Sequence, residues 1–298
     1  MPKLTEKREE LELEPEEEIS IKVSWFEVFR RKKLALFGIF LLLGAIGTAI
    51  FSPYLTRYNP QRLDVNIRLQ GPSSTHLLGT DDFGRDVYSR IIFGTRVSLL
   101  VGGAVMLFTS LVGILFGMLA GFYKSLDIVL MRIMDGFMAF PAMVMAIALM
   151  AAMGPSVLNV IIALAFIYMP RTAQIVRSVV LVGREMVYVQ AARALGARDL
   201  RITLKHILPN CIPPLIVQST FIFAYSILAE ASLSFLGVGV PPEIPSWGNI
   251  ISSGRLFIRE APWLTLFPGL AILLTCLALN LLGDGLRDAL DPRMREFI

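Results

Sequence analysis

Between two long apolar stretches, the sequence reads YVQAARALGARDLRITLKHILPN at residues 188–210. This polar island is basic, contains two adjacent alanines and has a glycine four residues after the second alanine. A connection between two membrane helices needs only a few polar residues, and this one is long and rich in small residues. The polar island is therefore predicted to bind a partner outside the membrane.

The composition around the island is that of an integral membrane protein. Hydrophobic residues make up 55% of the chain and charged residues 17%, whereas about a quarter of a soluble protein is charged. An apolar stretch of about 20 residues crosses the hydrocarbon core, and it does so as a helix because lipid offers no partner to backbone groups. The six candidate spans are Leu34–Ser52, Val97–Phe122, Ile128–Met153, Val157–Val180, Ile212–Phe235 and Trp263–Leu282. The first is interpreted as an uncleaved anchor, since its apolar core is too long for a signal peptide and an acidic tail precedes it.

The distribution of basic residues predicts that both termini lie in the cytoplasm. Counted from Lys22 onward and with the N-terminus inside, 17 lysines and arginines fall on the cytoplasmic side and eight on the other, which is the bias that orients membrane proteins. The polar island is then cytoplasmic. Residues 1–18 hold eight glutamates and are predicted to be a solvated tail. The aromatic and basic segment at residues 25–33 is interpreted as a membrane-surface anchor rather than a partner site.

Nucleotide-binding and catalytic motifs are missing from the sequence. There is no G-x-x-x-x-G-K-[ST] loop to hold a nucleotide. The two histidines, His76 and His206, fall on opposite sides of the predicted membrane, which argues against a zinc cluster or a histidine-based triad. Cys211 and Cys276 have no paired spacing and are interpreted as small buried or lipid-facing residues. No catalytic residue and no metal site is predicted.

The first outer loop contains acidic residues that imitate a metal site beside His76: Asp81, Asp82 and Asp86. Turn and capping duties explain them better. Thr80 or Asp81 is expected to cap one short helix, and Asp86 to precede another.

Few ionisable residues fall inside the predicted spans. They are Asp135, Glu230, and Arg171 or Arg177 near one end of the fourth span. A charge at the centre of a span costs about 2.5–3.5 kcal/mol on insertion scales, so it usually faces the bundle interior. Glu230 is interpreted as a pathway or packing residue. Asp135 follows Arg132 by three residues, which suggests an intrahelical ion pair, and direct substrate contact remains an alternative for both carboxylates.

The polar island itself predicts a helix–turn–helix. Small or apolar residues share one face of the first helix: Ala191, Ala192 and Leu195. Gly196 can end this helix in a left-handed conformation. Asp199 can start a second short helix, which Pro209 helps to end. Such an element suits docking into a groove, while the alternative is a surface helix that only covers the bundle.

The island also matches a known family. The segments QAARALG (190–196) and HILPN (206–210) resemble the "EAA" cytoplasmic loop of ABC importer permeases. Four further segments resemble motifs of the "C" subunit in the dipeptide, oligopeptide and nickel permease subfamily. They are HLLGTDDFGRD (76–86), AEASLSFLG (229–237), PSWG (245–248) and NLLGDGLRDALDP (280–292). The resemblance covers about residue 25 to the C-terminus.

The resemblance implies an all-α integral membrane protein with six transmembrane helices and the type I ABC importer (MetI-like) permease fold. It implies an acidic tail and interfacial segment (1–33), an anchor helix with an extracytoplasmic loop (34–96), a five-helix permease core (97–285) and a cytoplasmic C-terminal tail (286–298). The core would carry a coupling loop at 182–210.

Two sets of site residues follow from the resemblance. The ATPase-coupling interface would comprise Tyr188, Gln190, Ala191, Ala192, Arg193, Leu195, Gly196, Asp199 and His206. The extracytoplasmic loop motif would comprise His76, Gly79, Thr80, Asp81, Gly84, Arg85, Asp86 and Trp247. Gln190 replaces the glutamate of the general motif, which puts a charged contact at this position in doubt but not docking itself.

The resemblance also implies the partners and the cellular location. A homologous permease subunit would complete a heterodimer, two cytoplasmic ATPase subunits would bind ATP and Mg, and an extracytoplasmic binding protein would deliver substrate. This chain would hold no cofactor, would bind no nucleic acid and would lie in a bacterial or archaeal cytoplasmic membrane. Di- or oligopeptides are the expected substrate, with nickel or glutathione as alternatives. An autonomous secondary carrier, channel or membrane enzyme would need membrane charges, repeats or residue clusters that the sequence does not show.

Overall fold

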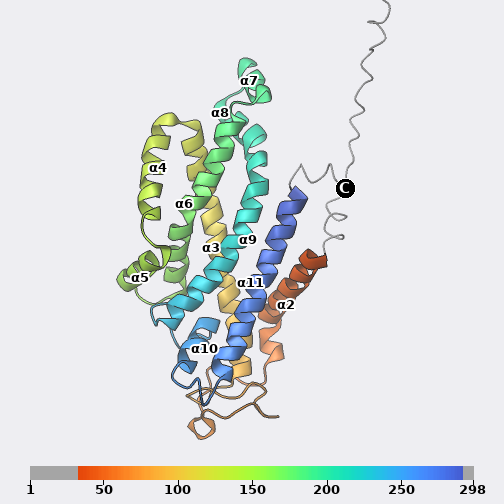
Figure 1. The fold of residues 1–298 in the computed structure, drawn as a ribbon, viewed down its shortest axis with the longest axis vertical. Coiled ribbons are helices and arrows are strands. Elements are labelled where there is room, and N and C mark those ends of the chain that lie inside the picture. The colour runs from red at the N-terminus through yellow and green to blue at the C-terminus, as the bar shows by residue number, and fades with distance from the viewer. Residues whose placement is uncertain (1–32, 291–298) are drawn as a thin grey trace, which may run out of the picture.

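The computed structural model describes residues 33–290, and in this range the regular elements are helices, with one isolated β-bridge between Thr80 and Asp86. The predicted acidic tail, most of the interfacial segment and residues 291–298 lie outside the described residues. Figure 1 shows the long helices running roughly along the longest axis of the molecule. Short helices α7 and α8 lie at one end of this axis, while α10 and the loop between α2 and α3 lie at the other.

Within residues 33–290, five helices are long and apolar enough to cross a membrane, and a bent helix pair raises the number to six. The five are α2 (Lys33–Leu55), α3 (Val87–Phe122), α6 (Val157–Gly183), α9 (Leu208–Phe235) and α11 (Trp263–Leu290). The remaining elements are η1 (Val65–Ile67), α4 (Lys124–Met138), α5 (Ala142–Met153), α7 (Val187–Ala194), α8 (Asp199–Ile202), η2 (Thr203–Ile207) and α10 (Trp247–Gly254). The all-helical architecture predicted from the sequence is confirmed in residues 33–290.

The third predicted span is broken. In place of one helix over Ile128–Met153, α4 and α5 meet at a bend of 91°. Pro141 lies at the break and explains it, because proline has no amide hydrogen and disfavours helical geometry in the preceding Phe140. A non-helical backbone at membrane depth is tolerated where it is covered by protein or lines a cavity.

The predicted end of the second short helix at Pro209 is wrong. Helix α8 continues through the π-helical turn η2 into α9, so that residues 199–235 form one apolar helix. Pro209 lies in the first turn of α9, where the wider turn before it and its own fixed φ angle allow the helix to continue.

Two helices are also longer than predicted. Helix α3 starts at Val87 rather than Val97, because Asp86 caps it with its carboxylate. Helix α11 continues to Leu290, beyond the expected Leu282.

Helices α3 and α6 form the most extensive contact in the bundle, and glycines bring them together. Gly113, Gly117 and Gly121 follow one another at intervals of four residues on α3. A Cβ atom at Gly117 would stand 2.5 Å from Cβ of Val176 and 2.6 Å from the carbonyl oxygen of Ala173. Small residues permit this approach of backbones, which drives helix association where lipid supplies no hydrophobic force.

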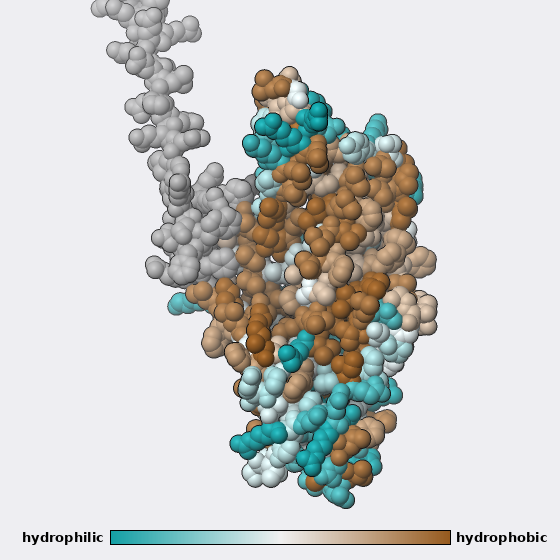
Figure 2. All heavy atoms as spheres, turned by 180° about the vertical axis from the view of Figure 1, so that it is seen from behind, coloured by the Kyte–Doolittle hydropathy of each residue, from teal (hydrophilic) through white to brown (hydrophobic). Residues whose placement is uncertain are grey.

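The surface carries an apolar belt. Figure 2 shows brown, apolar side chains covering the middle of the visible face, with hydrophilic side chains gathered toward both ends. On α2, Leu34, Phe40 and Tyr54 expose more than two thirds of their side chains. This distribution matches a bundle surrounded by hydrocarbon.

Candidate functional site

The predicted helix–turn–helix is present and lies at one end of the bundle (Figure 1). Gly196 ends α7 with φ of +82°. Its amide donates to the carbonyl of Arg193 at 2.9 Å, and the amide of Ala197 donates to that of Ala192 at 3.0 Å. These two bonds form a Schellman motif, which satisfies the last carbonyls of a helix and favours glycine at the left-handed position.

The inner face of the helix–turn–helix is fixed to the bundle. Val189, Ile202 and Ile207 are at most 1% exposed. They share an apolar cluster with Val176 of α6 and Leu215 of α9, among other residues. Apolar contacts therefore hold both short helices against α6 and α9.

Polar side chains connect α7 to the start of α9. Asn210 donates to the hydroxyl oxygen of Tyr188 at 2.9 Å and to the carbonyl of His206 at 3.1 Å. The rings of Tyr188 and His206 lie 6.3 Å apart. Tyr188 and His206 therefore stabilise the element from within.

Gln190 uses its side chain in a way that glutamate cannot. Its amide nitrogen donates to the carbonyl of Glu185 at 3.1 Å, across the turn between α6 and α7. An ionised carboxylate has no hydrogen to donate. The departure from the family motif therefore has a structural role in this chain.

The outer face of the helix–turn–helix is apolar and uncovered. Leu195 is 89% exposed, Val187 81% and Leu200 70%. Ala191 is exposed, and the space that a Cβ atom would take at Gly196 is open. Arg193 and Asp199, whose atoms Nη2 and Oδ1 stand 3.6 Å apart, lie between the two helices.

Val187, Leu200 and Leu204 were not among the residues predicted from the sequence. The feature of the sequence that could have revealed them is the presence of large apolar residues in an otherwise polar island. That signal is weak, because the pattern does not distinguish them from the buried Val189 and Ile202.

At the opposite end, the α2–α3 loop is built around the carboxylate of Asp81. Its Oδ1 accepts from the amides of Phe83 at 2.9 Å and Arg85 at 2.8 Å, and its Oδ2 accepts from Nε of Arg85 at 2.6 Å. Gly84 has φ of +71°, and a Cβ atom there would overlap the carbonyl oxygen of Asp64. This turn therefore requires both the aspartate and the glycine.

Asp86 has a capping duty, as predicted, while Asp82 makes only a 3.9 Å contact with Arg85. Asp86 caps α3 by accepting from the amide and the hydroxyl of Ser89 at 2.8 Å and 2.7 Å. Its second oxygen accepts from Nδ1 of His76 at 2.9 Å. The expectation that Thr80 or Asp81 caps a short helix is wrong. Thr80 instead pairs with Asp86 in the β-bridge and donates to the carbonyl of Ile67.

Two tryptophans join this loop region to the helices. Trp247 is 1% exposed, and its indole donates to the carbonyl of Ile91 on α3 at 3.2 Å. Trp263 donates to the carbonyl of Thr80 at 3.2 Å and packs against Gly79, whose φ is +80°. The predicted motif residues therefore form one connected frame across α3, α10 and α11.

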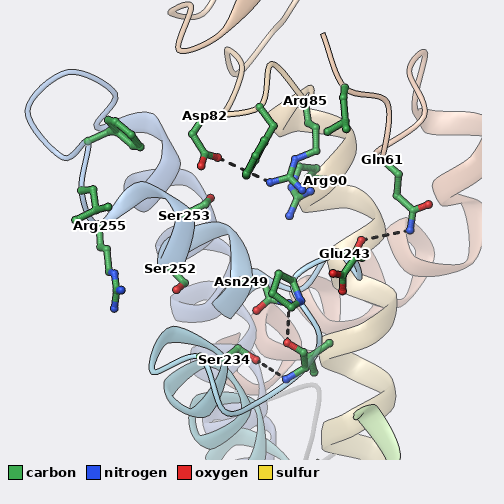
Figure 3. A pocket seen from close by; sticks show the side chains of 17 residues that line it. Gln61, Asp82, Arg85, Arg90, Ser234, Glu243, Asn249, Ser252, Ser253 and Arg255 are labelled. Carbon is green, nitrogen blue, oxygen red and sulfur yellow. Dashed lines mark hydrogen bonds and ion pairs between the residues drawn. The ribbon is translucent and has the colours of Figure 1, made fainter. Parts of the chain in front are cut away.

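A cavity of about 600 Å³ opens between this frame and α10. Figure 3 shows Asp82 and Arg85 from the α2–α3 loop, and Asn249 and Ser252 from α10, among its lining side chains. Arg90 is 1% exposed, and its Nε stands 3.6 Å from Oδ2 of Asp81. Burial, followed by the adjacent Asp81 charge, raises the pKa of Asp82 above its ordinary value. The buried carboxylate of Asp81 is therefore the main charged partner of two arginines, Arg85 and Arg90.

Asp81→Asn is expected to destabilise the folded protein by about 3–5 kcal/mol, because the change leaves buried guanidinium groups without their charged partner. Thermal unfolding of the purified protein in lipid nanodiscs measures the effect. Asp82→Asn is the matched control. It should cost less than about 1 kcal/mol, since Asp82 is only partly buried and pairs with Arg85 at 3.9 Å. Equal losses of stability for the two variants would contradict the assignment of Asp81 as the main charged partner.

Of the two carboxylates predicted inside spans, Glu230 is fully buried. It accepts from the hydroxyl of Ser98 on α3 at 3.1 Å and from that of Ser234 at 2.8 Å. This geometry, in which a carboxylate joins two packed helices, favours the packing interpretation over the pathway interpretation.

Asp135 does not form the predicted intrahelical pair. It accepts from the side-chain amide of Gln174 on α6 at 3.0 Å. Among residues 33–290, no ion pair within 4.0 Å joins it to Arg132. The prediction was wrong because sequence spacing does not reveal that α6 offers Asp135 a nearer partner.

Comparison with known proteins gives the family. Residues 113–296 match the family described as the binding-protein-dependent transport system inner membrane component. The chain belongs to the ABC importer permeases. Residues 24–72 match the N-terminal transmembrane domain of oligopeptide transport permease C, which agrees with the subfamily resemblance seen in the sequence.

Curated relatives of this permease span nearly the same length. It is 50% identical over 268 residues to a putative peptide transport system permease protein of Brucella suis biovar 1, covering 90% of each chain. It is 43% identical to the dipeptide transport system permease protein DppC of Alkalihalophilus pseudofirmus, covering 95% of this chain and 94% of that one. It is 42% identical to the glutathione transport system permease protein GsiD of Pectobacterium atrosepticum, covering 93% and 94%.

Membership of the family confirms the predicted fold class and the predicted class of function. The chain is a multi-pass membrane subunit of an ATP-driven importer, and it cleaves no bond itself, since ATP hydrolysis belongs to a separate subunit. An ATPase and a binding protein are therefore general partners of the system. The roles of individual residues are not given by the family match and are proposed below.

Proposed function

We propose that this permease forms half of the translocation pathway for di- or oligopeptides, and that its helix–turn–helix (residues 187–202) couples ATPase closure to the alternation of the pathway. The observation that carries the coupling role is the uncovered apolar outer face, where Val187, Leu195 and Leu200 are at least 70% exposed. This element lies at the end of the bundle, beyond the apolar belt. A soluble partner with an apolar groove would cover this face and remove it from water.

The positions of the ends of α2 and α11 support the membrane orientation predicted from the basic residues. The start of α2 and the end of α11 are the ends of these two helices that point toward α7 (Figure 1). If the helix–turn–helix contacts a cytoplasmic ATPase, both helix ends face the cytoplasm of a bacterial or archaeal cell. The α2–α3 loop and α10 then face the extracytoplasmic binding protein, and the cavity between them lies at the outer mouth of the pathway.

The proposed assembly contains one homologous permease as the second half and two ATPase subunits that bind ATP and Mg. ATP binding closes the ATPases, which moves the helix–turn–helix and its buried anchors Val189, Ile202 and Ile207. Because these anchors pack on α6 and α9, the bundle switches as a rigid body between two states. Peptide as the substrate is supported by the names of the relatives from Brucella suis and Alkalihalophilus pseudofirmus. The glutathione permease supports the alternative of a modified peptide, while nickel receives no support from these relatives.

Reconstituted vesicles test this function. We expect vesicles holding both permeases and both ATPases, supplied with binding protein and ATP, to accumulate a labelled dipeptide at least about tenfold faster than vesicles lacking ATP. Omission of either permease should reduce uptake to the same low level. Competition with unlabelled glutathione and with Ni²⁺ distinguishes the substrate alternatives. ATP-independent uptake by vesicles holding this chain alone would overturn the proposal in favour of a secondary carrier.

A further inference from the structure

A second cavity, of about 480 Å³, lies between α5, α6 and α9. We call it the central cavity. Its lining includes four polar side chains: Tyr168 and Arg171 of α6, and Gln218 and Tyr225 of α9. None of these residues belongs to the helix–turn–helix or to the frame around Asp81.

The four polar side chains are not used by the described part of the chain. Within residues 33–290, the guanidinium of Arg171, the amide of Gln218 and the two phenol groups make no side-chain hydrogen bond or ion pair. Neighbouring polar groups on the same helix are paired. Gln174 donates to Asp135, and Arg177 forms a two-pronged ion pair with Asp127. The cavity therefore keeps a cation and three hydrogen-bonding groups free while nearby groups are satisfied.

Arg171 lies in the middle part of α6, one of the helices long and apolar enough to cross a membrane. It stands 14 residues after Val157 and 12 before Gly183, so about 21 Å and 18 Å of helix separate it from the two ends of α6. From the sequence, Arg171 or Arg177 was expected near one end of the fourth span, whereas Arg171 lies at a similar distance from both ends of α6. An arginine exposed at this depth is not stable against lipid, and such residues face a water-filled pathway or a protein partner.

The break between α4 and α5 also reaches the central cavity. Ala142, the first residue of α5, lines it, and no side chain caps the start of this 12-residue helix. The first amides of a helix carry a partial positive charge. Broken helices that present such a terminus to a membrane site are a known means of binding anionic groups. The positive electrostatic potential at the start of α5 therefore adds to that of the Arg171 guanidinium.

We propose that the central cavity is a transit site for the C-terminal carboxylate of the imported peptide, with Arg171 as its ligand. A guanidinium pairs with a carboxylate through two parallel hydrogen bonds. The phenol groups of Tyr168 and Tyr225 and the amide of Gln218 suit the amides of a short peptide backbone. This inference rests on the proposed peptide import and names the chemical group that the pathway recognises.

Arg171→Gln tests the inference in the reconstituted importer. Uptake is measured for a labelled dipeptide with a free carboxylate and for the same dipeptide with a C-terminal amide. The rate for each substrate is divided by the wild-type rate for that substrate, which removes the selectivity of the unchanged binding protein. We expect Arg171→Gln to lower the free-acid ratio about tenfold, as loss of a charge-assisted hydrogen bond implies, and the amide ratio less than about twofold.

Arg177→Gln is the matched control, because Arg177 lies on the same helix but pairs with Asp127 outside the central cavity. It should change both ratios equally. Arg171→Lys keeps the positive charge and should restore much of the free-acid uptake. This variant still tests the inference if Arg171→Gln inserts poorly into the membrane.

Two outcomes would overturn the inference on its own. Equal loss of both substrates in Arg171→Gln, with normal assembly, would remove Arg171 from carboxylate binding. Loss of co-purification with the second permease would assign Arg171 to the subunit interface. If the wild-type importer takes up neither form of the peptide, it is the proposed function that fails rather than the role of Arg171 within it.

Discussion

Gly196→Pro is expected to lower peptide uptake by at least about 100-fold while leaving the permease inserted in the membrane. Gly196 has φ of +82°, which proline, fixed near −65°, cannot adopt. Proline also removes the amide that donates to the carbonyl of Arg193. An incompatible proline costs about 3 kcal/mol or more, which shifts the equilibrium constant between the native turn and other conformations by about 100-fold.

Gly196→Asn is the matched control, since asparagine tolerates the left-handed conformation and keeps its backbone amide. A Cβ atom at this position meets open space, so no steric penalty is expected in the isolated permease. ATP-dependent uptake in vesicles and co-purification of the ATPases are measured for both variants. Normal uptake by Gly196→Pro would show that the turn has no part in coupling, and the proposed role of the helix–turn–helix would have to be abandoned.

The helix–turn–helix was predictable because its signals are local. Gly196 ends a helix by its own conformational freedom, and Asp199 starts the next one at the predicted residue. Whether Pro209 ends a helix, in contrast, does not depend on its immediate neighbours alone. A proline ends a helix or lies in its first turn depending on the hydrogen bonds before it, and the π-helical turn at Thr203–Ile207 decided the case. Only the three-dimensional packing of Ile207 against the bundle shows why that turn is there.

The break in the third span shows a similar limit. Pro141 was visible in the sequence, but apolar residues continue on both sides of it, so hydropathy joined α4 and α5 into one span. The central cavity depends on this break, and its residues are dispersed over three elements. Gln218 and Tyr225 share one face of α9 through their spacing of seven residues, but nothing in the sequence places that face beside Arg171 of α6. The turn around Asp81, in contrast, comes from one continuous segment, residues 76–86, and was found as a motif, although the roles of Thr80 and Asp81 as caps were mistaken.

The second large effect is expected at the contact between α3 and α6. Gly117→Leu should prevent the permease from folding, with a loss of more than about 3 kcal/mol. A Cβ atom at Gly117 already stands 2.5 Å from Cβ of Val176 and 2.6 Å from the backbone oxygen of Ala173. A backbone atom cannot move aside like the end of a flexible side chain, so leucine forces the two helices apart. Overpacking of a tight core costs about 1–3 kcal/mol for smaller insertions than this one.

Gly103→Leu on the same helix provides the comparison. A Cβ atom at Gly103 meets only the ring of Phe223 at 3.8 Å, which is ordinary contact, so this variant should fold. Size-exclusion profiles and thermal unfolding in detergent report the folded fraction of each variant. Because both changes add the same side chain to one helix, a general effect of leucine on insertion would appear in both. A folded, thermally stable Gly117→Leu protein would mean that α3 and α6 need not approach as closely as the glycine spacing indicates, and the rigid transmission from the helix–turn–helix through α6 would lose its structural basis.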